Sequence, residues 1–179
     1  RRTGILSAII LATCPLYYGA SHYANLDLEV AALISICLFS TALGLKTQKA
    51  RFFIIAYIFS ALAFLTKGLI GLAFPAMILM SWMLILNRWD MLKKIFLPTG
   101  LLIFITITLP WYVLVQKANP QFFHFFFIDQ QVSRFLTNGA FNNRTPIWFY
   151  LPIFLAGIFP WSIFIFQAIY KNSKAIWQN

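Results

Sequence analysis

Residues 51–87, RFFIIAYIFSALAFLTKGLIGLAFPAMILMSWMLILN, decide the fold. Two apolar runs, 52–66 and 69–87, are interrupted only by Lys67 and Gly68. A run of this length that carries no charge is typical of a helix surrounded by lipid. The segment therefore predicts two membrane helices joined by a very short connection.

The rest of the chain has the same character. Of its 179 residues, 61% are hydrophobic, 18% are aromatic and only 10% are charged. A soluble domain carries about a quarter charged residues on its outside, so lipid must cover most of this protein. We predict an all-α integral membrane protein. Cys14 and Cys37 lie inside apolar runs and show neither a disulfide framework nor metal-ligand spacing.

Six apolar runs predict about six transmembrane helices, at 4–20, 28–44, 52–66, 69–87, 95–115 and 147–169. No internal repeat or soluble segment divides residues 1–179, so we expect a single transmembrane domain. Several prolines, including Pro15 and Pro160, predict kinked or broken helices. The one long connection, 116–146, is expected to form an extracytoplasmic interfacial loop.

The basic residues indicate how the helices are oriented. When the connections are assigned alternately to two sides, ten Lys and Arg residues fall on one side and four on the other. The first set is Arg1, Arg2, Lys46, Lys49, Arg51, Arg88, Lys93, Lys94, Lys171 and Lys174, and the second is Lys67, Lys117, Arg134 and Arg144. The positive-inside rule places the first set in the cytoplasm. The net charge of +10 thus reflects topology, because no basic stripe for nucleic acid is present.

Three of the four acids fall on the outer side, and two of them open the second predicted helix. Asp27 and Glu29 can bind a divalent cation, accept a hydrogen bond from a sugar or act as a base. Asp27 can equally serve as the N-cap of helix 28–44. On a regular helix the two side chains point about 200° apart, so a shared metal would require Asp27 to lie outside the helix. The need for a metal cofactor is left open.

Lys67 follows a predicted helix of about 15 residues, roughly 22 Å long, against a hydrocarbon core of about 30 Å. We therefore expect Lys67 to lie below the outer surface and to face a polar or anionic cavity, although it could also reach the interface by extending its side chain. Gly68 suits the C-cap of this helix.

The long connection combines phenylalanines at 122–127 with polar residues from Asp129 onward, which indicates an interfacial helix. Gln130 and Arg134, four residues apart, would share one helical face. A guanidinium is suited to forked binding of phosphate. Arg144 is a weaker candidate, because it can also act at the start of the last helix. Lys67 and Arg134 together fit an anionic lipid head group, such as the phosphate of a long isoprenoid.

Several segments occur in an order that resembles the lipid-A aminoarabinose transferase and protein mannosyltransferase-like family, whose members are membrane glycosyltransferases of the GT-C fold. They are ALAFLTKGLIGLAFP, LPWYVLV, NPQFFHFFF, QVSRFL and PIWFYLPIFLAGIFPW. The resemblance implies transfer of a sugar from a polyprenyl-phosphate donor to lipid A or another envelope acceptor, at the periplasmic face of the inner membrane. It also implies that residues matching Lys67, Arg134 and Asp27 share one charged cavity.

The resemblance further implies that the principal catalytic acid lies in a first outer loop that would precede Arg1. We therefore expect the chain to be a fragment that is inactive alone, with Asp27 as a supporting acid. The family often has histidines where this chain has Gln130 and Asn143, so any role for imidazole there is in doubt. Two alternatives from another class are a non-catalytic isoprenoid-phosphate flippase or transporter, and an inactive remnant subunit.

Overall fold

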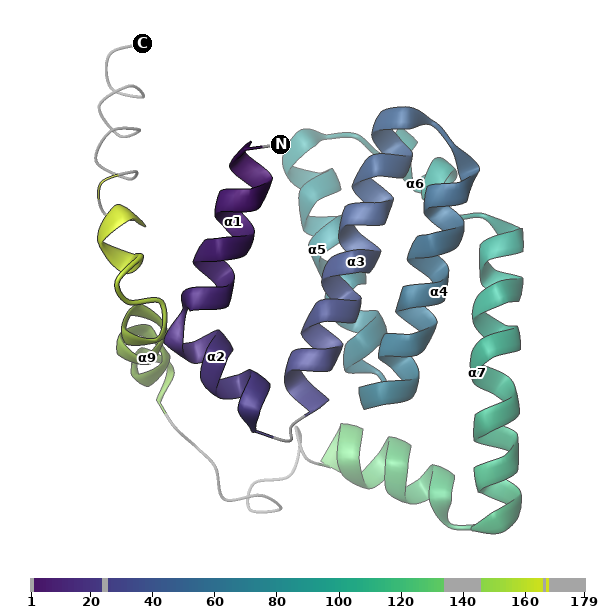
Figure 1. The fold of residues 1–179 in the computed structure, drawn as a ribbon. Helices are drawn as coiled ribbons and strands as arrows, with labels where there is room; N and C mark the ends of the chain where they lie inside the picture. Colours follow the sequence, from purple (N-terminus) through teal and green to yellow (C-terminus); the bar gives the residue numbers. More distant parts are fainter. Residues whose placement is uncertain (1, 24–25, 134–145, 166, 168–179) are drawn as a thin grey trace. The chain divides into compact units, whose positions relative to one another are not determined.

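The computed structural model describes residues 2–23, 26–133, 146–165 and 167, and all regular elements in these ranges are helical. The predicted all-α class is confirmed. The chain forms two compact units, which are described separately (Figure 1). The central unit is Glu29–Asn142, and the flanking unit combines Arg1–Leu28 with Asn143–Asn179. The assignment of residues 1–179 to one transmembrane domain stays a prediction.

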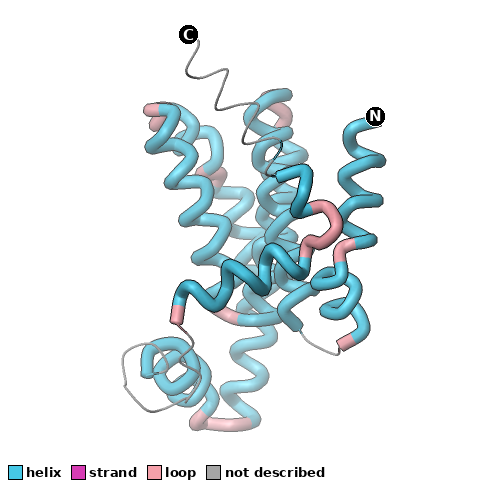
Figure 2. The backbone as a smooth tube through the Cα atoms, turned by 90° about the vertical axis from the view of Figure 1, so that its left-hand side faces the viewer, coloured by secondary structure: helices cyan, strands magenta, loops and turns pink. Residues whose placement is uncertain are grey.

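The central unit is a bundle of helices that run alternately up and down (Figures 1 and 2). Its elements are α3 (Leu26–Thr47, which begins in the flanking unit), α4 (Ala50–Lys67), α5 (Ile70–Leu86), the short α6 (Asp90–Ile95), α7 (Pro98–Ala118) and the π-helix η1 (His124–Ser133). The tightest packing in this unit is that of α4 against α5 and α7. The predicted interfacial helix is present as η1, which runs across the end of the bundle (Figure 1).

Small residues allow these helices to approach closely. A Cβ atom added at Gly71 of α5 would lie 2.3 Å from the backbone of Ala63 in α4. One added at Gly100 of α7 would lie 2.2 Å from the ring of Tyr57 in α4. Lipid tails are as apolar as leucine, so membrane helices gain little by hiding apolar side chains and instead depend on close contact. The two glycines therefore fix the position of α4 in the bundle.

The flanking unit is built from shorter pieces. They are α1 (Arg2–Thr13), α2 (Pro15–His22), the 3-10 turn η2 (Ile147–Phe149) and α9 (Tyr150–Gly157). Pro15 occupies the first turn of α2, and α1 and α2 meet at a bend of 63°. The indole N–H of Trp161 donates a hydrogen bond to Oγ1 of Thr13 at 2.9 Å, which joins the two ends of this unit.

The structure agrees with some of the six predicted membrane helices better than with others. Within the described residues, α3, α4 and α7 are long and apolar enough to cross a membrane, and the bent α1–α2 pair counts as a fourth if it is one span. α5 is an apolar helix of 17 residues and falls just short of the length needed to cross a membrane. The predicted breaks at Pro15 and Pro160 are confirmed, because the run 4–20 divides into α1 and α2 at Pro15 and the run 147–169 is interrupted by a turn after Gly157. The total of six stays a prediction.

Within the described ranges, prolines interrupt helices in the flanking unit alone. Pro75 and Pro110 lie inside the continuous helices α5 and α7, so no break occurs at either position. Pro98 begins α7, where the missing N–H is harmless. The predicted loop 116–146 is also shorter at its start, since α7 continues to Ala118.

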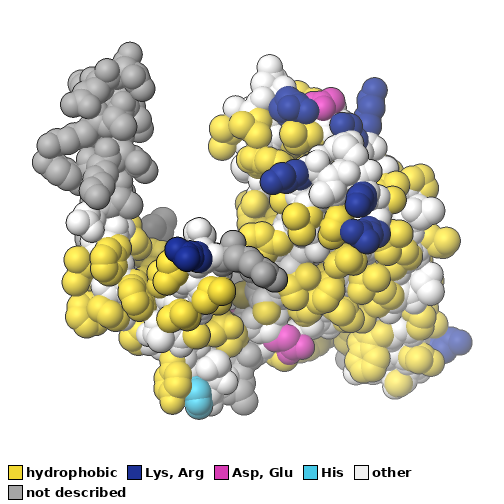
Figure 3. Space-filling model, turned by 45° about the horizontal axis from the view of Figure 1, so that its top comes forward, with side chains coloured by type: hydrophobic (Ala, Val, Ile, Leu, Met, Phe, Trp, Pro, Cys, Tyr) yellow, Lys and Arg dark blue, Asp and Glu magenta, His cyan; other side chains and the backbone are white. Residues whose placement is uncertain are grey.

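Charges separate between the two ends of the central unit. The turn from α3 to α4 and the segment from α5 through α6 lie at one end, here called the basic end, and carry Lys46, Lys49, Arg51, Arg88, Lys93 and Lys94, all of them exposed. Figure 3 shows Lys and Arg gathered there with one acid among them. At the opposite end, Lys67 is the last residue of α4 and Lys117 lies in the last turn of α7. The predicted alternation is confirmed for the described part of this unit.

Candidate functional site

The opposite end of the central unit, here called the polar end, is formed by the first turn of α3, the last turns of α4 and α7, the start of α5, and η1 (Figure 1). It contains Glu29, Lys67, Asp129 and Gln130 among the described residues. All four were singled out from the sequence as outer-side residues, and the bundle brings their elements to one end.

Lys67 is the last residue of α4 and is half-buried. Gly68 follows it with φ 70° and donates its N–H to the carbonyl of Phe64 at 2.8 Å. A positive φ favours glycine, which has no Cβ atom, and the predicted C-cap at Gly68 is confirmed. The predicted helix length is wrong, because α4 begins at Ala50 and has 18 residues, about 27 Å. Lys67 therefore lies at the end of a nearly full-length span.

An aromatic cluster joins the end of α4 to η1. Tyr112 of α7 is only 6% exposed, and its ring contacts those of Phe64, Phe122, Phe123, Phe126 and Phe127, with centroids 5.4 to 6.4 Å apart. Its hydroxyl also donates to the Phe64 carbonyl at 3.4 Å, a long hydrogen bond. The same carbonyl accepts the Gly68 N–H. Tyr112 thus ties η1 to the residues that position Lys67.

The corner between α7 and η1 is held by one side chain. Gln116 donates from Nε2 to the carbonyl of Pro120 at 2.7 Å and accepts the N–H of Phe123 at its Oε1 at 3.0 Å. Asn119, which caps α7, accepts the N–H of Gln121 at 3.2 Å. These bonds satisfy backbone groups in the turn between α7 and η1, and they fix the direction in which η1 leaves.

Gln130 lies in η1 and is half-buried. One turn earlier, Nδ1 of His124 lies 3.6 Å from Oδ2 of Asp129. The face predicted for Gln130 and Arg134 assumed α-helical spacing, whereas the described part of η1 has the i to i+5 hydrogen bonds of a π-helix. Arg134 and Arg144 lie outside the described residues, so their convergence on Lys67 stays a prediction.

Asp27 and Glu29 both lie within α3, which begins at Leu26. The condition for a shared metal, that Asp27 lie outside the helix, is therefore not met. No group of three or more His, Cys, Asp or Glu side chains suited to a metal ion occurs among the described residues. Both acids instead lie in the first turns of the helix, where the helix dipole stabilises negative charge.

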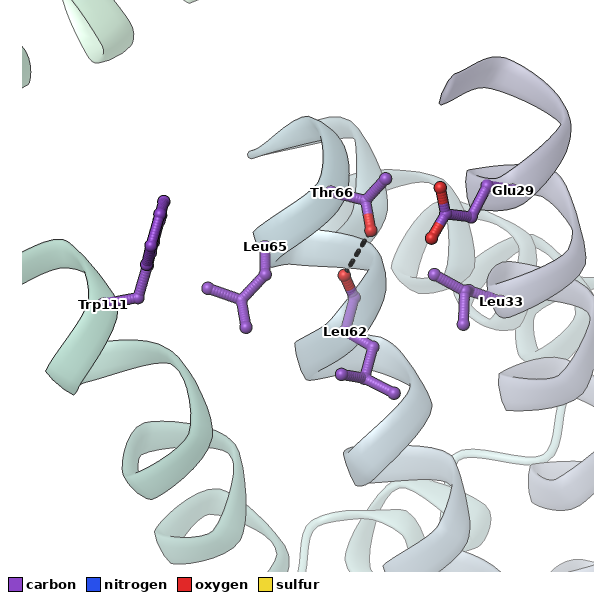
Figure 4. A pocket seen from close by; sticks show the side chains of 6 residues that line it. All are labelled: Glu29, Leu33, Leu62, Leu65, Thr66 and Trp111. Atoms are coloured by element: carbon purple, nitrogen blue, oxygen red, sulfur yellow. Dashed lines mark hydrogen bonds between the residues drawn. The ribbon is translucent and has the colours of Figure 1, made fainter. Parts of the chain in front are cut away.

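The structure adds a pocket that the sequence did not predict. It has a volume of about 370 Å³ and is lined by Glu29, Leu33, Leu62, Leu65, Thr66 and Trp111 (Figure 4). We call it the Glu29 pocket. The carboxylate of Glu29 points from α3 toward the hydroxyl of Thr66 on α4, and Trp111 of α7 lies beyond Leu65. Thr66 precedes Lys67 in the segment ALAFLTKGLIGLAFP, and the sequence did not predict that this threonine lines a pocket.

These features define an integral membrane protein with a bundle of closely packed helices and one elaborated polar end. Residues 1–113 match the family described as dolichyl-phosphate-mannose-protein mannosyltransferase. The chain belongs to this family, and the resemblance seen in the motifs is confirmed.

Among curated relatives, the chain is 33% identical over 167 residues to the undecaprenyl phosphate-alpha-4-amino-4-deoxy-L-arabinose arabinosyl transferase of Enterobacter sp. (strain 638), covering 90% of this chain and 30% of that protein. It is 34% identical over 166 residues to the enzyme of the same name from Erwinia tasmaniensis, again covering 90% of this chain and 30% of the relative. The chain thus spans about a third of these relatives' length.

Two solved structures have a fold similar to that of this chain. The crystal structure of ArnT from Cupriavidus metallidurans bound to undecaprenyl phosphate has a TM-score of 0.81 and 28% identity to this chain, covering 93% of it and 30% of that protein. The apo structure of the same protein has a TM-score of 0.76 and 26% identity, covering 90% of this chain and 29% of the other. The expected GT-C type of fold is confirmed for this part of the architecture.

Proposed function

We propose that the protein containing this chain is a polyprenyl-phosphate-dependent glycosyltransferase. Its donor would be undecaprenyl phosphate carrying an amino sugar, and its acceptor lipid A or another envelope molecule at the periplasmic face of the inner membrane. The observation that carries the proposal is the fold likeness over 93% of this chain to a protein solved with undecaprenyl phosphate bound. The names of the relatives supply the donor.

In the proposed reaction an acceptor oxygen attacks the anomeric carbon of the sugar. The bond from that carbon to the carrier phosphate breaks, and the phosphate leaves with the electron pair. The site must neutralise the charge growing on this phosphate and hold the acceptor in line. Lys67 and Arg134 are proposed for the first task, since an ammonium and a forked guanidinium both bind phosphate oxygens.

The remaining residues have supporting roles in this proposal. The amide of Gln130 would donate a hydrogen bond to a donor oxygen, and Arg144 would add positive charge. Asp27 would orient the acceptor as a supporting acid. The structure favours Lys67 in particular, because its position is fixed by the Gly68 cap and, through Phe64, by the Tyr112 cluster. A site that stabilises charge works best when its groups are held in place beforehand.

The test is a transfer assay on the full-length protein reconstituted with undecaprenyl phosphate-aminoarabinose and lipid A. The expected product is lipid A carrying the amino sugar, together with released undecaprenyl phosphate. Arg134→Ala is expected to abolish product while the protein still inserts into membranes. A flippase would instead move the donor across the bilayer and leave the sugar attached, so donor movement without product would reject the glycosyltransferase and favour the transporter.

A further inference from the structure

The Glu29 pocket presents only hydrogen-bond acceptors at its polar side. Oγ1 of Thr66 donates its one proton to the carbonyl of Leu62 at 2.8 Å (Figure 4), so this hydroxyl offers a ligand its lone pairs alone. An ionised Glu29 carboxylate is likewise only an acceptor. The other lining residues are three leucines and Trp111, and the indole N–H is the single side-chain donor among them.

The Glu29 carboxylate is also available to a ligand. Within the described part of the chain, no hydrogen bond or ion pair joins it to another residue. It is the one charged side chain in the lining, so the pocket carries negative charge. A phosphate would be repelled, whereas a cation that donates hydrogen bonds would be attracted. The pocket thus favours a cationic ligand, whereas Lys67, which follows Thr66 in the sequence, favours an anionic one.

We propose that the Glu29 pocket binds a primary ammonium group attached to a largely apolar or ring-shaped body. The ammonium would donate to a carboxylate oxygen of Glu29 and to Oγ1 of Thr66, with its third proton left for water or another acceptor. The leucines and the flat face of Trp111 would contact the body, because sugar rings and alkyl chains both pack on such surfaces. Hydrogen bonds from charged donors are about twice as strong as neutral ones.

Two molecules at this membrane face have that chemistry. One is the amino sugar of the donor, and this source rests on the proposed function. The other is the ethanolamine head group of a membrane phospholipid, which needs no catalytic role. In the first case Glu29 determines which sugar the enzyme accepts, and in the second it holds a structural lipid beside α4.

The experiment uses the full-length protein and the variant Glu29→Gln, which removes the charge while keeping the shape. Transfer is measured with undecaprenyl phosphate-aminoarabinose and with the matching arabinose donor, in which a hydroxyl replaces the amine. In parallel, native mass spectrometry measures retention of phosphatidylethanolamine against phosphatidylglycerol. Asp90→Asn at the basic end is the matched control, and Thr66→Val is a second variant in case Glu29→Gln does not fold.

If the amino sugar is the ligand, Glu29→Gln lowers the preference in kcat/KM for the amine donor over the hydroxyl donor by about tenfold or more, because only the amine donor loses an ion pair. Thr66→Val lowers the same preference by a few-fold. If the lipid is the ligand, donor preference is unchanged and retention of phosphatidylethanolamine falls instead. Either result supports ammonium binding by the Glu29 pocket. If donor preference and lipid retention both stay unchanged, the proposal is overturned. Absence of transfer by the wild-type protein would refute the proposed function alone, because lipid retention still tests the pocket.

Discussion

The two ends of the central unit use charge in opposite ways. At the basic end six Lys and Arg side chains are exposed, and the closest ion pair there, Arg88 with Asp90, has both side chains about half exposed at 53% and 51%. At the polar end the half-buried Lys67 ends α4 directly before the Gly68 cap, three residues after Phe64 of the aromatic cluster. Exposed basic side chains at one end are sufficient to orient a membrane protein. A half-buried lysine whose helix end is held by neighbouring residues is the charge to test for a role in chemistry.

Replacing Lys67 gives the largest expected effect. If Lys67 has the proposed role, Lys67→Ala in the full-length protein should lower the transfer rate by about a hundredfold or more, because a preorganised cation that faces a leaving phosphate contributes on that scale. The measurement is sugar transfer under saturating donor. The exposed Lys117→Ala at the same end and Lys94→Ala at the basic end are the controls. If all three variants lost the same amount of transfer activity, the half-buried Lys67 would have no role that the exposed lysines lack.

Truncating Tyr112 comes next. Tyr112→Ala removes a buried ring that contacts five phenylalanines, so we expect a loss of about 3 kcal/mol in stability and weaker transfer as η1 loosens. Tyr112→Phe keeps the ring and loses only the 3.4 Å hydrogen bond to Phe64, so it should stay close to wild type. Thermal unfolding in detergent distinguishes the two. A Phe variant as unstable as the Ala variant would show that the hydroxyl, and not ring packing, joins α7 to α4.

Gly68→Ala probes the cap of α4 directly. The φ of 70° at this position is unfavourable for a residue with a Cβ atom, so we expect a loss of about 1 kcal/mol in stability and a few-fold loss of transfer. Gly19→Ala is the control, since a Cβ atom there meets nothing within 4 Å. Hydrogen exchange of the last turn of α4 should rise in Gly68→Ala alone. Unchanged exchange would mean that the cap does not hold Lys67.

The smallest effect belongs to the basic end. The hydrogen bonds from Arg88 lower the pKa of Asp90 below its usual value. A depressed folded-state pKa contributes stability above the unfolded-state pKa of about 4, and this contribution is lost as pH falls through the lower, folded-state pKa. Asp90→Asn should therefore narrow the difference in melting temperature between pH 6 and pH 3 by a barely measurable amount, because both partners face solvent. A large change would contradict the view that this end only orients the chain.

Much of the central unit could be predicted from sequence, because apolar run length reports directly on helices in lipid. The runs at 28–44 and 52–66 each became a longer helix, the run at 95–115 became a helix of the same length shifted by three residues, and Gly68 capped α4 as expected. Broken helices were harder to locate. Pro75 and Pro110 have the same local chemistry as Pro15, yet only Pro15 interrupts its helix, since neighbouring helices can support a proline inside a membrane span.

The sequence by itself determined the solvent, the helical class and the alternation of basic connections, because each depends on local composition and charge. Two features depended on the tertiary structure alone. The ring of Tyr112 contacts five phenylalanine rings, and Glu29, Thr66 and Trp111 line one pocket. These contacts join helices far apart in the chain, and they depend on glycines 71 and 100 allowing α4 to approach its neighbours. Close packing of that kind is a property of pairs of surfaces, and the pattern along one helix does not specify it.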